Sequence, residues 1–194
     1  MRIFGIDPGS VRTGYGCVES DGRVSRLVAC GAITSPSTDS FPERLSRIHR
    51  ELAALLARCS PDCVAIETVF HAANIRTALK LGHARGVAVL AAVENGSPVV
   101  EYTPAEVKRA VVGYGRAEKH QVQQMIRVLL GLHQIPSPHD AADALAVAIC
   151  HLHSLPPADL TRRRGRADRA AAPAPRVRVP LPKTWRQYRP PTNG

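Results

Sequence analysis

The sequence predicts an α/β fold in which a five-stranded mixed sheet is flanked by helices. Three observations support this prediction. A tight turn joins two of the first strands, and the later strands alternate with amphipathic helices. In addition, about 150 of the residues have the composition of a folded domain, which is long enough to bury a single core.

Five short apolar runs have the length of strands. They are Arg2–Asp7, residues 13–19, residues 24–34, Cys63–Glu67 and residues 98–102. Asp21 and Gly22 lie between the second and third runs, and an Asp-Gly pair in this position is typical of a β-hairpin. We therefore expect these two strands to be antiparallel neighbours.

Segments with helical spacing of apolar residues separate the later strands, and we expect four or five helices. The segments are residues 41–59, 75–93, 104–112, 118–130 and 138–153. Ser40 with Glu43, and Thr103 with Glu106, have the spacing of a capping box. Gly113 follows the third segment and predicts its end. For the last segment, Ser137 is the expected N-cap and Pro138 the expected first helical residue.

Charge is distributed unevenly along the chain. Of the net charge of +10, residues 154–194 carry +8, because they contain ten basic and two acidic side chains; they also contain eight of the sixteen prolines. This composition predicts a disordered basic tail at 154–194 and a folded domain at 1–153. The tail is either a salt-sensitive tether to nucleic acid or a solvated segment without such a role.

Composition also excludes several classes of protein. No apolar run approaches the ~18 residues of a membrane span, and the first residues lack the layout of a signal peptide. The five cysteines are odd in number and form no C-x-x-C pair. We expect reduced, mostly buried thiols in a cytoplasmic protein. Cys59 and Cys63 are spaced for a metal site, but no second cysteine pair completes it.

Four acidic residues lie where a ligand crevice is expected. Asp7 and Glu67 are the last residues of two buried strands, whose carboxyl ends open into such a crevice. Asp140 and Asp143 are three residues apart on the last helix and therefore share a face. The helix N-terminus favours their ionised forms. We expect all four carboxylates to converge.

This set of oxygen ligands indicates metal chemistry. Four ionised carboxylates repel one another unless divalent cations neutralise them, and an all-oxygen set suits Mg²⁺ or Mn²⁺ better than zinc. Two such ions roughly 3.5–4 Å apart hydrolyse phosphodiesters: one lowers the pKa of the attacking water, and the other stabilises the leaving oxygen. The hypothesis is a metal-dependent nuclease.

Each of these carboxylates also has a purely structural interpretation. Asp7 before a Pro-Gly pair is typical of a turn, and Glu67 could be an exposed residue at a strand end. Asp140 follows Ser137 by three residues, which is the spacing of a weak capping box. Asp143 interrupts an apolar helix, where a structural role is hard to find. A purely structural role for all four carboxylates together is a much less favourable explanation than a structural role for any one of them.

Five stretches of sequence carry a resemblance to a known family. They are GIDPG followed by TGYG within residues 5–16, IETVF at 66–70, LKLGHARGV at 79–87, VK to VVG within 107–113, and DAADALA at 140–146. In this order and spacing they resemble the RuvC family of crossover-junction endodeoxyribonucleases. The resemblance covers roughly residues 1–153.

The resemblance implies a ribonuclease H-like fold and a homodimer that resolves four-way Holliday junction DNA in recombination and repair. Each subunit would nick one of two symmetry-related strands. The resemblance places Asp7, Glu67, Asp140 and Asp143 on the family's catalytic, metal-binding positions. It implies two Mg²⁺ ions per subunit, with Mn²⁺ as a substitute, and the branch-migration proteins RuvA and RuvB as partners.

The resemblance also implies DNA contacts for Phe70, Lys108 and Lys119. The lysines would neutralise phosphate charge, and Phe70 would stack on an unpaired base. Otherwise the lysines are solvated helix residues and Phe70 packs in the core. His139 directly precedes Asp140, but successive helical residues point about 100° apart. We therefore expect His139 to contact the metal-binding side chains at most, and not to bind the metal itself.

One helix face has a small residue at every fourth position: Ala78, Gly82 and Gly86. These residues allow close approach of another element, either the sheet or, as the resemblance implies, the second subunit of a dimer.

Three other functions fit parts of the sequence. GIDPGS at residues 5–10 resembles the phosphate loop of actin-like ATPases and sugar kinases, but the second acidic-glycine loop and the adenosine pocket of those enzymes are not recognisable. An RNA-processing nuclease of the same fold shares the carboxylates. A non-catalytic DNA-binding module is supported by charge alone, and an acidic crevice opposes it.

Overall fold

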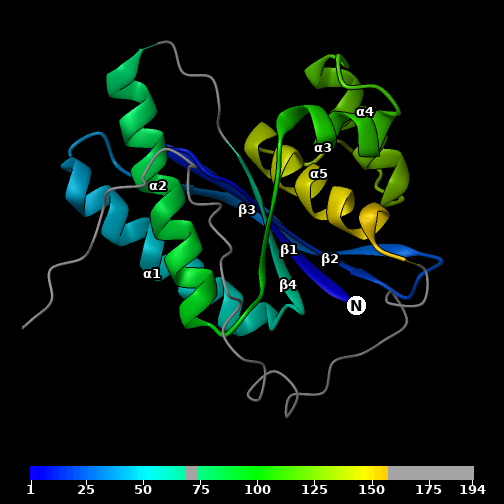
Figure 1. Ribbon diagram of the computed structural model, residues 1–194, viewed down its shortest axis with the longest axis horizontal. Helices are drawn as coiled ribbons and strands as arrows, with labels where there is room; N and C mark the ends of the chain where they lie inside the picture. Colours follow the sequence, from blue (N-terminus) through cyan, green and yellow to red (C-terminus); the bar gives the residue numbers. More distant parts are fainter. Residues whose placement is uncertain (69–73, 157–194) are drawn as a thin grey trace, which may run out of the picture.

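A computed structural model describes residues 1–68 and 74–156 and contains the predicted five-stranded mixed sheet (Figure 1). Its strands are β1 (Arg2–Asp7), β2 (Arg12–Ser20), β3 (Ser25–Thr34), β4 (Cys63–Glu67) and β5 (Val99–Tyr102). They are ordered β3-β2-β1-β4-β5, with β1, β2 and β3 antiparallel and β4 and β5 parallel to β1. The Asp21-Gly22 turn joins β2 to β3, as predicted, with Gly22 at φ 90°.

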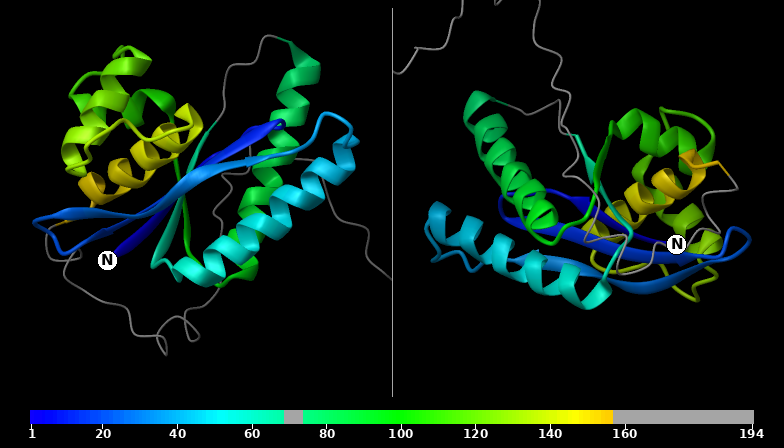
Figure 2. Two further views of the ribbon diagram at one scale, coloured as in Figure 1. Left: turned by 180° about the vertical axis from the view of Figure 1, so that it is seen from behind. Right: turned by 60° about the horizontal axis from the view of Figure 1, so that its bottom comes forward.

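Five helices cover the two faces of this sheet. They are α1 (Phe41–Cys59), α2 (Ile75–Glu94), α3 (Pro104–Val112), α4 (Lys119–Leu129) and α5 (His139–Ser154). α1 and α2 lie on one face, and α5 lies on the other with α3 and α4 outside it (Figure 2). Both predicted capping boxes are present, and Gly113 ends α3 at φ 96°. The sheet therefore separates two apolar cores.

The predicted start of α5 is wrong by one residue. Pro138, not Ser137, is the N-cap, and the first helical residue is His139. Pro138 has an extended ψ of 174°, which places it outside the helix, and no side-chain hydrogen bond caps this end. Asp140 is therefore the second residue of α5 and completes no capping box with Ser137.

α5 lies directly on the sheet because glycines stand where it crosses β1 and β2. A Cβ on Gly5 would overlap the carbonyl oxygen of Ala144, and a Cβ on Gly14 would overlap that of Asp140. Any side chain at these positions would push the helix outward. The glycines therefore fix how closely α5, which carries Asp140 and Asp143, approaches the strands.

Four of the five cysteines are buried, as the sequence predicts. Within the described ranges 1–68 and 74–156, no helix combines the length and the apolar character needed to cross a membrane.

Candidate active site

Strand alternation directs Asp7 and Glu67 toward α5. Asp7 ends β1 and Glu67 ends β4, and these strands are parallel neighbours with Ile6 opposite Ile66. Alternate side chains of a strand face the same way. In β4, Ala65 lies in the core beneath α5, whereas Ile66 lies in the core beneath α1 and α2. Glu67 therefore projects to the α5 side, and the same alternation places Asp7 there.

α5 supplies the other two carboxylates from its first two turns. The side chains of Asp140 and Asp143 are 28% and 22% exposed, so both are partly buried at the site that we call the crevice, which the four carboxylates define. The charges of both act on Asp7, and a side-chain hydrogen bond joins Asp7 to Glu67. Three separate elements thus place the four predicted carboxylates near enough for the charges of the other three to act on Asp7.

Burial raises the pKa of Asp7 to about 8. Loss of hydration is the largest cause, and the charges of Glu67, Asp143 and Asp140 add to it. Burial also raises the pKa of Glu67. Near neutral pH the protonated Asp7 carboxyl donates its hydrogen bond to Glu67. Burial and repulsion between the carboxylates therefore keep one of the four carboxyl groups protonated near neutral pH.

Both lysines named by the sequence resemblance lie at this crevice. Lys119 begins α4, and its Nζ is 2.6 Å from Oδ2 of Asp143. Partial burial lowers the pKa of Lys119, but the ion pair with Asp143 outweighs it, and the net pKa is raised. Lys108 is on α3 and lowers the pKa of Glu67 through its charge. Both lysines therefore interact with carboxylates of the site.

A third cation at the crevice was missed by the sequence reasoning. Arg12 begins β2, and its Nη1 is 3.3 Å from Oδ2 of Asp140. Strand alternation could have indicated the position of Arg12 from the sequence. Arg12 points the same way as Gly14, and Gly14 contacts α5. With Asp7 protonated, three carboxylates face three cations.

The donor set fits divalent metal binding. The acidic groups of the site offer carboxylate oxygens, which is the ligand chemistry of Mg²⁺ and Mn²⁺. Burial, and after it the neighbouring carboxylate charges, raise the pKa of Asp7, and a bound cation would offset both effects. In the described part of the chain, no three acidic, histidine or cysteine side chains already meet as ligands. Asp140 and Asp143 are instead turned to Arg12 and Lys119, and would have to exchange these partners for an ion.

The remaining predicted residues lie elsewhere. His139 is exposed, and its Nδ1 is 3.0 Å from Nε2 of Gln123, a buried side chain on α4. This contact ties α4 to α5. Phe70 lies outside the described residues, as does the tail beyond residue 156.

Comparison with known proteins places these features in one family. The sequence profile described as crossover junction endodeoxyribonuclease RuvC matches residues 3–151. A protein of that name from Alkaliphilus oremlandii is 53% identical over 154 residues, which cover 79% of this chain and 94% of the relative. A second relative of the same name, from Chloroflexus aggregans, is 52% identical over 156 residues, covering 80% of this chain and 95% of its own length.

Solved structures agree with the sequence comparison. The structure of Thermus thermophilus RuvC is 38% identical and superposes with a TM-score of 0.73. T. thermophilus RuvC in complex with Holliday junction substrate superposes with a TM-score of 0.76. Each match covers 79% of this chain and 94% of the other.

Proposed function

The chain belongs to the RuvC family of crossover junction endodeoxyribonucleases, and from this premise we propose that it cuts Holliday junctions with Asp7, Glu67, Asp140 and Asp143 as its metal-binding catalytic residues. The fold is ribonuclease H-like, as the sequence resemblance implied. The observation that supports the site assignment is the grouping of four carboxylates from β1, β4 and α5 in a crevice where burial, and then the charges of the other three, raise the pKa of Asp7.

The carboxylates and the lysines of the crevice have different roles in the proposed reaction. The four carboxylates would hold two Mg²⁺ ions, which supply a lowered pKa for the attacking water and charge stabilisation for the leaving oxygen. Lys108 and Lys119 would neutralise the phosphate group and position it. Lys119 would leave Asp143 as that carboxylate turns to the ion.

Cleavage of a synthetic four-way junction beside a linear duplex of the same sequence tests this proposal. We expect paired nicks in the junction with Mg²⁺ and none with EDTA. Efficient cutting of the duplex, or cutting without a divalent ion, would contradict the assignment. A structured RNA in the same assay separates DNA-junction resolution from RNA processing.

Metal binding is expected to release a proton from Asp7. Because its pKa is about 8, Asp7 is largely protonated at pH 7, and an ion must displace that proton. We expect Mn²⁺ affinity to rise from pH 6 to pH 8 and then to level off. Calorimetry in buffers of different ionisation enthalpy measures the proton release. Asp7→Asn should abolish it, and wild-type binding that is independent of pH in this range would be contrary to the prediction.

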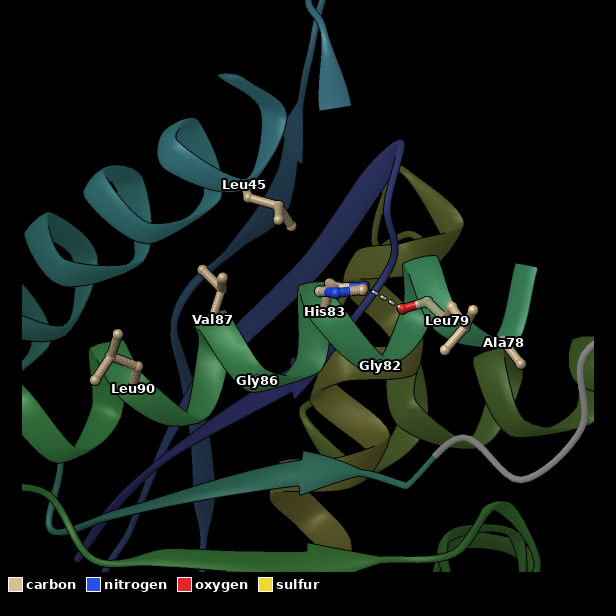
Figure 3. Close-up of a pocket in the computed structure, with 8 residues that line it drawn as sticks. All are labelled: Leu45, Ala78, Leu79, Gly82, His83, Gly86, Val87 and Leu90. Carbon is tan, nitrogen blue, oxygen red and sulfur yellow. Dashed lines mark hydrogen bonds between the residues drawn. The ribbon is translucent and has the colours of Figure 1, made fainter. Parts of the chain in front are cut away.

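A second copy of the chain is the proposed partner of α2. Apolar side chains and the small-residue face of α2 line a groove of about 510 Å³ beside α1 (Figure 3). Its lining residues are Leu45, Ala78, Leu79, Gly82, His83, Gly86, Val87 and Leu90. A Cβ on Gly82 or Gly86 would meet no atom within 4 Å, so this face does not pack on the sheet of its own subunit. A two-fold dimer through α2 would match a junction with two symmetry-related strands.

A charge placed in this groove is expected to separate the subunits. Leu79 is 59% exposed, so Leu79→Glu should leave the folded subunit intact while opposing a dimer through α2. Sedimentation should then show a monomer, and paired nicking should be lost. Val128→Glu is the matched control, because Val128 is 63% exposed on α4 and lies outside the groove. A dimeric Leu79→Glu variant would place the interface elsewhere.

We also propose the domain division at residues 153 and 154. The family match ends at residue 151 and α5 ends at Ser154, which supports a nuclease domain that stops there. The partnership with RuvA and RuvB, and a cytoplasmic location, rest on membership of the family.

Truncation after residue 156 tests the basic tail. Removal of its positive charge should weaken binding to any DNA, most strongly at low salt, while junction cleavage survives. Binding of truncated and full chains to junction and duplex is compared at several salt concentrations. Equal affinity at low salt would leave the tail without a DNA role.

A further inference from the structure

Arg12 lies beside the active crevice, although the proposed mechanism assigns it no role. Its Nη1 is 3.3 Å from Oδ2 of Asp140, and its side chain is 49% exposed. A guanidinium has five N–H donors. Among the described residues, Asp140 is the only hydrogen-bond partner of the Arg12 side chain. Most of its donors therefore remain available at the mouth of the crevice.

The fold determines where this arginine stands. Arg12 and Gly14 are two residues apart in β2 and face the same way. Gly14 lies against the backbone carbonyl of Asp140, so the start of β2 and the first turn of α5 are in direct contact. The Arg12 guanidinium is thus kept within reach of Asp140 by the packing of the two elements.

The Asp140 carboxylate cannot pair with Arg12 and bind a divalent ion equally well at the same time. If its carboxylate turns to an ion, Arg12 loses its partner and is left beside an added positive charge. The anion that then enters the crevice is the phosphate backbone of the substrate. A guanidinium, with its planar fork of donors, is well suited to bind phosphate.

We propose that Arg12 is a phosphate-binding residue of the active crevice. In the absence of metal Arg12 pairs with Asp140, and it becomes available to phosphate when Asp140 binds a divalent ion. This inference rests on the proposed function, because it takes Asp140 as a metal ligand and DNA as the substrate. Its consequence is a coupling between two ligands: Arg12 contributes to junction affinity only when the metal is bound.

Junction binding by the full-length Arg12→Gln variant tests this coupling. Affinity is measured by fluorescence anisotropy in Ca²⁺ and in EDTA over a range of salt, and a denaturing gel verifies that the strands stay intact. In Ca²⁺ we expect the variant to bind about fivefold more weakly, with a salt slope shallower by about 0.9, the value for one phosphate contact. In EDTA the two proteins should bind alike.

Two further variants isolate the cause. Arg26→Gln removes the same charge from an exposed arginine that pairs with Asp21 in the hairpin, and should change neither affinity. Arg12→Lys keeps the charge but loses the fork, and should fall between wild type and Arg12→Gln in Ca²⁺. An equal loss in Ca²⁺ and EDTA, or no loss in Ca²⁺, would overturn the proposal.

A DNA-free measurement separates this inference from the proposed function. Without Arg12, an ion no longer competes for Asp140, so Arg12→Gln should bind Mn²⁺ about three- to fivefold more tightly than wild type, as expected for loss of an exposed ion pair. Unchanged Mn²⁺ affinity would reject the competition. If wild type cuts no junction in Mg²⁺, the proposed function fails, yet this titration still tests Arg12 against Asp140.

Discussion

Asp7→Asn is expected to abolish junction cleavage while leaving junction binding nearly intact. The asparagine keeps the size of the side chain but removes one anionic ligand from the centre of the carboxylate set, where burial is greatest. Loss of one such electrostatic contribution lowers turnover by about 10²- to 10³-fold. Single-turnover cleavage and anisotropy with the same junction measure the two properties. Cleavage within tenfold of wild type would remove Asp7 from the reaction.

The same variant should stabilise the metal-free protein at pH 8. In the unfolded chain Asp7 ionises near its ordinary pKa of 3.8, whereas in the folded protein it stays protonated up to about pH 8. The folded state therefore binds more protons across this range, and the stability of wild type falls as pH rises from about 4 to about 8. A carboxylate that is costly for folding but required for activity is typical of an active site.

Denaturation by urea in EDTA at several pH values checks this effect. Because one unit of pKa corresponds to about 1.4 kcal/mol and the pKa of Asp7 rises from 3.8 to about 8, we expect Asp7→Asn to gain several kcal/mol at pH 8 and little at pH 4. Asp62→Asn is a control for loss of a carboxylate outside the crevice. A gain that is the same at both pH values would show that the raised pKa of Asp7 is not its cause.

Local patterns predicted most of the fold and the proximity of the four carboxylates. The bounds of β1 and β4 agree with the prediction because each is a short apolar run ended by an acidic residue. Asp140 and Asp143 share a helix face through spacing alone. Their convergence with Asp7 and Glu67 could be expected because carboxyl ends of strands open into a common crevice.

The interactions that the sequence did not predict depend on packing between distant segments. Arg12 and Asp140 are 128 positions apart, and their contact follows from the close approach of α5 to β2 at Gly14. The raised pKa of Asp7 likewise needs the burial and the charges that only the folded crevice provides. The start of α5 was misplaced because the proline ring fixes only φ, and the ψ of Pro138 is extended at 174°.

Gly14→Ala is expected to disable the site without altering any of its functional groups. The new methyl group would overlap the carbonyl oxygen of Asp140, so the first turn of α5 must move away from β2. Overpacking of this kind costs about 3 kcal/mol, and it displaces Asp140 from the carboxylates on β1 and β4. We expect Mn²⁺ affinity and cleavage to fall together, because a small misplacement of a reacting group has a large effect on rate.

Gly115→Ala provides the matched control for this change. Its added Cβ would lie at an ordinary contact distance of 3.4 Å from the Ala105 carbonyl oxygen, so stability and cleavage should stay close to wild type. Urea denaturation, Mn²⁺ calorimetry and junction cleavage are measured on both variants. If Gly14→Ala loses stability but binds Mn²⁺ as tightly as wild type, then Asp140 keeps its place when α5 shifts, and the glycine contact serves folding alone. Parallel loss of metal affinity and cleavage, at a temperature where the variant remains folded, would show that the distance between α5 and β2 is itself a determinant of the active site.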